Sequence, residues 1–133
     1  MFRFAFLALL MPGLAGFAFP EEKAITPAEA AKMVDKNCLV EMKVASVGLD
    51  KNKVNVFLNS KESYKDKDNF TILLKGTMAK TLKETLKYED PVEYFKDKTI
   101  RVEGKVTLFR ESPQIVVEKA DKLSVVPSPE KKN

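Results

Sequence analysis

The chain has 133 residues, of which 44% are hydrophobic and 32% charged, so its composition indicates one folded domain rather than a disordered segment. A formal net charge of +4 permits weak attraction to polyanions without demanding it. The chain has no histidine, so it lacks the commonest general base and the commonest transition-metal ligand. Its single cysteine, Cys38, excludes an intramolecular disulfide, and we interpret it as a small buried thiol.

The start of the chain differs in composition from the rest. Arg3 is its only charged residue before the first glutamates, and a run of apolar and small residues follows it. This pattern predicts a secretory signal peptide over residues 1–18, with cleavage after Ala18; cleavage after Ala15 and an uncleaved anchor are the alternatives. The apolar run is shorter than the roughly 20 residues that span a bilayer. We therefore expect export to the periplasm or beyond the cell, with no membrane span after cleavage.

A short helix is expected at the start of the domain. Thr26 is placed as an N-cap, Pro27 suits the first helical position, and Glu29 completes a capping box. We expect this helix to end near Asn37.

Three stretches of alternating hydrophobicity follow, at 38–49, 53–60 and 69–76, and predict half-buried strands. The residues expected to face inward are Val40, Met42, Val44, Val54, Val56, Leu58, Phe70, Ile72 and Leu74. The residues expected to face outward from the middle strand are Lys53, Asn55, Phe57 and Asn59. The loop at 61–68 carries three lysines and three acids, so its zero net charge does not predict a phosphate-binding loop.

The second half of the chain begins with an amphipathic helix. Met78, Leu82 and Leu86 recur every four residues, and Pro91 is expected to stop the helix. Alternation then predicts strands at 99–111 and 115–126, joined by a hairpin loop at 111–114, with the last strand bent at Asp121. The inward residues of the strand at 99–111 are expected to be Ile100, Val102, Val106 and Leu108. Gly104 also falls on this inward face and predicts a bulge or bend. Residues 127–133 are predicted to form a disordered tail.

The order of three strands, a helix and two strands resembles the OB-fold. The stretches "VEGKV" at 102–106, "PQIVV" at 113–117 and "LSVV" at 123–126 resemble the last two strands of OB-fold domains, and residues 56–76 are similar to two strands of secreted bacterial OB-fold proteins of unassigned function. The resemblance spans residues 38–126. It implies a mainly β protein: a small five-stranded barrel at 19–126, with a helix between the third and fourth strands and a short N-terminal helix.

The resemblance also implies where a ligand would bind. In OB-fold domains the binding surface is formed by the second and third strands and by the loops between strands one and two and strands four and five. On this chain that surface corresponds to the strands at 53–60 and 69–76. The candidate ligand-binding residues are Lys53, Asn55, Phe57, Thr71, Lys75 and Arg110, with Leu73 between them and Asp50, Lys51, Asn52 and Glu111 on the rims. Phe57 is a candidate for stacking on a base or sugar, although packing under a helix or loop is the alternative.

Two functions from different classes remain open. The first is an exported binding module for single-stranded nucleic acid, or for another oligomeric ligand such as a glycan. The second is a protein-interaction or structural module without a small ligand. No catalytic motif, metal-ligand cluster or cofactor-binding motif is recognised, so we expect neither enzymatic activity nor a cofactor. A nuclease of the same fold ranks below both, because its catalytic acids and arginines cannot be matched to this chain.

Overall fold

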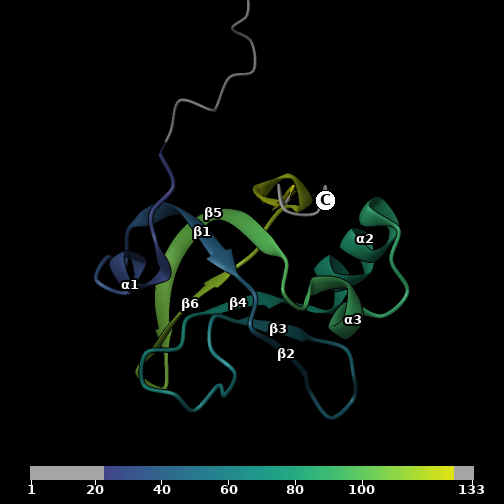
Figure 1. Ribbon diagram of the computed structural model, residues 1–133, viewed down its shortest axis with the longest axis horizontal. Coiled ribbons are helices and arrows are strands. Elements are labelled where there is room, and N and C mark those ends of the chain that lie inside the picture. The colour runs from purple at the N-terminus through teal and green to yellow at the C-terminus, as the bar shows by residue number, and fades with distance from the viewer. Residues whose placement is uncertain (1–22, 128–133) are drawn as a thin grey trace, which may run out of the picture.

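The computed structural model describes residues 23–127, so the predicted signal peptide and all but the first residue of the predicted tail lie outside the described residues. The protein is mainly β (Figure 1). The strands are β1 (Asn37–Lys43), β2 (Ser46–Leu49), β3 (Val56–Asn59), β4 (Thr71–Leu74), β5 (Thr99–Phe109), β6 (Ser112–Val116) and β7 (Leu123–Val126). The helices are α1 (Pro27–Ala30), α2 (Gly76–Leu86), α3 (Pro91–Phe95) and the 3₁₀ turn η4 (Ala120–Lys122). Figure 1 shows α1 at the left end of the strands and α2 with α3 at the right end.

The seven strands form one sheet in the order β1-β5-β6-β4-β3-β2, with β7 also paired to β5. All pairs are antiparallel except β4 with β6. The two ends of this order, β1 and β2, follow one another along the chain but are not paired with each other in the described part. The prediction of a mainly β protein with a helix before the last two predicted strands is therefore confirmed, whereas the strand number of five is wrong.

Two predicted strands are split, and this accounts for the larger number. The stretch 38–49 becomes β1 and β2 because it changes partner at Val44. The backbone of Val44 leaves the ladder with β5 and bonds to the turn at 97–98, after which the N–H of Ala45 donates to the carbonyl of Asn59, the last residue of β3. A chain that pairs with β5 and then with β3 must bend between them. The stretch 115–126 is likewise divided into β6 and β7, with η4 close to the expected bend at Asp121.

The N-terminal helix begins as predicted but is shorter. The Thr26 hydroxyl accepts a hydrogen bond from the N–H of Glu29 at 3.1 Å, and the Glu29 carboxylate accepts one from the N–H of Thr26 at 2.9 Å. The helix ends at Ala30 rather than near Asn37. The following residues are drawn onto β5, because the N–H of Asp35 donates to the carbonyl of Val106, and Asp35 itself is left-handed at φ 72°.

The core contains nearly all of the residues predicted to face inward. The buried ones are Val40, Met42, Val44, Val56, Leu58, Phe70, Ile72, Leu74, Ile100, Val102 and Val106. Two predictions are wrong: Val54 is 48% exposed because β3 begins only at Val56, and Leu108 is 53% exposed because it lies beyond the part of β5 that β1 covers. Cys38 is buried, as predicted, and burial raises the pKa of its thiol.

The helical part after β4 is divided in two. Helix α2 buries Leu82 and ends before Lys87, whose left-handed conformation stops it, and not at Pro91 as predicted. Asp90 then caps α3 by accepting a hydrogen bond from the N–H of Val92. Tyr88, Tyr94 and Phe95 pack together with ring centroids 4.7–5.3 Å apart. Burial, with a smaller contribution from Tyr94, raises the pKa of Tyr88 to about 12.

Candidate ligand-binding face

The outward face of the sheet carries an apolar row across four strands. Gly48 of β2 lies opposite Phe57 of β3, Phe57 opposite Leu73 of β4, and Leu73 opposite Val116 of β6. All four are partly buried, with an exposure between that of surface residues and that of core residues. We name Gly48, Phe57, Leu73 and Val116 the apolar row. Sequence analysis singled out Phe57 and Leu73 but missed Gly48 and Val116, because no local pattern reveals that β6 pairs in parallel with β4.

A polar row lies beside the apolar row, two residues along each strand. It consists of Ser46, Asn59, Thr71 and Gln114, which are opposite one another in the same ladders. The Thr71 hydroxyl donates to the Asn59 side-chain oxygen at 2.9 Å and accepts from the Asn69 amide at 3.0 Å. Asn59 faces outward as predicted but is only 4% exposed. Thr71, a predicted ligand-binding residue, therefore has its hydroxyl occupied by bonds within the protein.

The charged loop at 61–68 is fixed to the sheet through its base. The Asn69 side chain accepts a hydrogen bond from the N–H of Lys61 at 3.0 Å and donates to Asn59 and Thr71. Ser46 completes the connection, because its hydroxyl donates to the carbonyl of Lys61 at 2.8 Å. The middle of this loop is exposed to solvent, while its two ends are held at one end of the outward face.

Lys53 and Asn55 do not lie on a strand, contrary to the prediction, but in the loop that joins β2 to β3. The Asn55 side chain accepts a hydrogen bond from the N–H of Gly76 at 2.9 Å and donates to Asp50 at 2.9 Å. Asp50 also accepts from the backbone N–H groups of Val54 and Asn55. These hydrogen bonds, that from Val54 first, lower the pKa of Asp50. Asn55 and Asp50 thus shape the loop, and Lys53 remains exposed at its tip.

The other two predicted basic residues lie at opposite ends of the face. Lys75 is exposed between β4 and the first turn of α2. Arg110 is exposed in the turn between β5 and β6, with its guanidinium 5.2 Å from the ring centroid of Phe109. Arg110 and Glu111 both have positive φ, at 55° and 68°, which defines a two-residue type I′ turn. The hairpin loop expected at 111–114 is therefore wrong, since Ser112 already pairs with Phe109.

Cationic residues flank the apolar row on both sides, at the two ends of its strands: Lys53 and Lys75 lie beyond one end, and Arg110 with the lysines of the charged loop beyond the other. Within residues 23–127, no three cysteine, aspartate or glutamate side chains gather so as to hold a metal ion. No helix in the described part of the chain is both long and apolar enough to cross a membrane.

Solved structures with this architecture include two of clear structural likeness. A lysozyme-bound OBody, AM1L10, matches over 84% of this chain and 100% of its own, with 11% identity and a TM-score of 0.54. An aspartyl-tRNA synthetase described as putative, from Leishmania major Friedlin, matches over 87% of this chain with 14% identity and a TM-score of 0.51. The chain has an OB-fold.

The OB-fold likeness concerns the fold alone, because the identities are low. This chain spans 23% of the length of the Leishmania synthetase chain. No protein-family model matches the sequence, and no curated protein matches it.

Proposed function

We propose that the protein is an exported, non-enzymatic binding module that holds single-stranded nucleic acid across the apolar row. The observation that carries this proposal is the placement of Phe57. Its side chain is partly exposed in the middle of the row, and its neighbour on β2 is Gly48, which has no side chain beyond a hydrogen to cover it. A base stacked on such an aromatic ring contributes about 1–3 kcal/mol.

Charge supports the same proposal. The lysines and arginine that flank the apolar row are exposed, so the backbone of a nucleic acid lying along the row would have cations on both of its sides. The polar row contributes less, because the hydrogen-bonding groups of Asn59 and Thr71 are already paired within the protein. Binding would then depend on stacking and phosphate contacts, with little base-specific recognition.

The test is fluorescence anisotropy of a labelled single-stranded oligonucleotide titrated with the protein at low and at physiological salt. Phe57→Tyr retains a stacking ring and is the matched control for Phe57→Leu, which retains apolar volume without the ring. We expect Phe57→Leu to weaken binding about fivefold or more and Phe57→Tyr to bind like the parent. Equal affinity of the two variants, or binding that is absent at physiological salt, would contradict the proposal.

A second candidate is a protein partner on the same face. Two of the four residues in the apolar row, Leu73 and Val116, are aliphatic, and the OBody that this fold resembles is bound to hen egg-white lysozyme. Such a complex would depend little on salt and would be recovered by gentle extraction from the native host. Recovery of the protein alone would count against it.

Export is proposed from the signal-peptide pattern at 1–18. Expression of the full chain, followed by N-terminal sequencing of the exported form, should give Phe19 as the first residue. Retention of Met1 in a cytoplasmic form would contradict export.

A further inference from the structure

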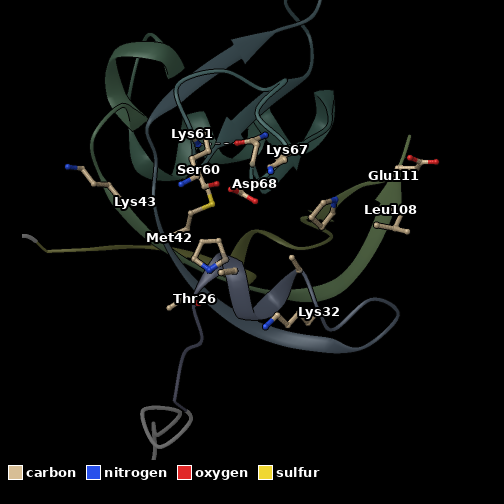
Figure 2. Close-up of a pocket in the computed structure, with 15 residues that line it drawn as sticks. Thr26, Lys32, Met42, Lys43, Ser60, Lys61, Lys67, Asp68, Leu108 and Glu111 are labelled. Atoms are coloured by element: carbon tan, nitrogen blue, oxygen red, sulfur yellow. Dashed lines mark hydrogen bonds between the residues drawn. The ribbon is translucent and has the colours of Figure 1, made fainter.

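A groove opens on a different part of the molecule from the apolar row. It has a volume of about 750 Å³ and lies between α1, the end of β1, the loop at 60–69 and the β5–β6 hairpin (Figure 2). This volume falls in the range of ligand-binding pockets, about 300–1,000 Å³. We name it the α1 groove. Its lining comes from four segments far apart in the sequence, which explains why sequence analysis did not detect it.

The base of the α1 groove is apolar. Its apolar lining consists of Pro27 and Ala31 on the side of α1 and of Leu108 and Pro113 on the hairpin, whereas Met42 of β1 also borders the groove but is only 2% exposed. Leu108 is 53% exposed although it follows the inward alternation of β5, so its aliphatic side chain is available to a ligand. An exposed leucine beside a groove contributes binding free energy when a partner covers it, because its apolar surface is then removed from water.

The walls of the groove are held in place by interactions already described. The capping box of Thr26 and Glu29 fixes α1, and Ile25 pairs with β1 through hydrogen bonds to Leu39 and Glu41. The side chain of Asn69 fixes both ends of the charged loop. A groove with fixed walls binds without a large cost of ordering its own residues.

The rim of the α1 groove is predominantly basic. Four lysines line it against two acids; these residues are Lys32, Lys43, Lys61, Lys67, Asp68 and Glu111. None of the four lysines has a salt-bridge partner within residues 23–127, where the two ion pairs join Arg101 to Glu41 and Lys122 to Glu103. The free ammonium groups and the apolar base complement a ligand that presents carboxylates around an aliphatic centre.

The lining also distinguishes between classes of anionic ligand. It contains no phenylalanine, tyrosine or tryptophan, so the groove offers bases no ring on which to stack, unlike the apolar row. Its cations are all lysines, which act as point charges and lack the planar fork with which arginine grips a phosphate. A peptide in which acidic residues flank aliphatic ones provides both the carboxylates and the apolar centre that the groove complements.

We propose that the α1 groove binds an acidic peptide segment of a partner protein, with aliphatic side chains on Leu108 and Pro113 and carboxylates on the lysine rim. This site shares Lys61 and Lys67 of the charged loop with the cationic flank of the apolar row but contains no residue of the row itself, and it does not depend on the nucleic-acid proposal. A protein that binds at both sites would bring a nucleic acid and a partner protein together.

The experiment uses a fluorescein-labelled ten-residue peptide, EEDLLPLDEE, titrated with the protein and followed by anisotropy. The charge-reversal variant Lys43→Glu/Lys67→Glu is compared with the matched control Lys80→Glu/Lys83→Glu, whose two lysines are exposed on α2. All four positions are exposed, so the variants should fold. We expect the groove variant to bind at least tenfold more weakly than the parent, and the control to bind within twofold of it.

Two further probes decide the chemistry. A peptide with serine in place of each leucine should bind at least fivefold more weakly if the apolar base contributes. No detectable binding of EEDLLPLDEE, equal losses in the groove and control variants, or equal affinity for the serine peptide would overturn the proposal. Binding of an oligothymidine that the groove variant abolishes and the Phe57→Leu variant leaves intact would assign the groove to nucleic acid and also overturn it.

Discussion

Gly104 of β5 is the position at which a single added methyl group should most damage the fold. It lies opposite Cys38, one residue before β5 ceases to pair with β1 and begins to pair with β6. A Cβ atom at this position would lie 2.6 Å from Cγ2 of Ile115, a fully buried residue of β6. The glycine is therefore required by a close approach between strands, whereas the bulge or bend expected at this position from the sequence stays a prediction.

The magnitude follows from that distance. Carbon atoms in contact prefer about 3.5–4.0 Å, so Gly104→Ala has to displace Ile115 or the strand by about 1 Å. Overpacking of this kind costs about 1–3 kcal/mol in a close-packed core. For a domain of this size each kcal/mol lowers Tm by about 4–8 °C.

The assay is urea denaturation followed by circular dichroism, with thermal melting as a second readout. Gly48→Ala is the matched control, because its added Cβ would lie 3.9 Å from Cβ of Phe57, an ordinary contact. We expect the control to be neutral or slightly stabilising, by about 0.5 kcal/mol, through the loss of unfolded-state freedom. Equal midpoints for Gly104→Ala and Gly48→Ala would refute the packing argument. In the double variant Gly104→Ala/Ile115→Ala, the new methyl group should offset part of the cavity, so the two effects should not add.

Three more predictions concern single residues. Asn69→Ala should lower the free energy of unfolding by about 1–3 kcal/mol in urea, because it removes the hydrogen bonds of a buried amide to Asn59, Thr71 and the N–H of Lys61, and a change below about 0.5 kcal/mol would contradict this. The pKa of Asp50 is lowered in the folded protein, so its ionised form stabilises the protein. This stabilisation is complete above the ordinary pKa of aspartate and is lost as pH falls through the folded pKa. The difference in the free energy of unfolding between the parent and Asp50→Asn should therefore be constant above about pH 5 and shrink in acid. A difference that persists unchanged to about pH 2 would contradict it. Lys87→Gly should raise stability by about 1 kcal/mol, because Lys87 is left-handed at φ 59°, whereas Lys83→Gly inside α2 should lower it by about as much, both read from thermal melting.

The placement of Phe57 was predictable from the sequence, whereas that of Asn55 was not. Phe57 lies between two apolar residues that alternate with it, and a period of two places it on the outward face wherever the strand is formed. Asn55 continues the same alternation, but its side chain is bonded to the N–H of Gly76, 21 residues away. That long-range bond ends the strand at Val56, and no local pattern signals it.

The turn between β5 and β6 was predicted at the wrong position for a related reason. A type I′ turn is normally recognised by asparagine and glycine at its central positions. Here Arg110 and Glu111 occupy them at positive φ, so the sequence favoured the Pro-containing stretch that follows. The turn is fixed instead by the pairing of the two strands that flank it, in which Phe109 lies opposite Ser112 and Leu108 opposite Pro113.

The sequence by itself determined the mainly β character, the order of its elements, the start of α1 and nearly all of the core, because each of these follows from hydrophobic periodicity or capping over a few neighbouring residues. Only the tertiary structure decided the division into seven strands, the apolar row, the burial of Asn59 and the α1 groove. Each of these depends on which segments pair across long sequence separations, and β-sheet pairing is set by register and packing between strands rather than by any one of them.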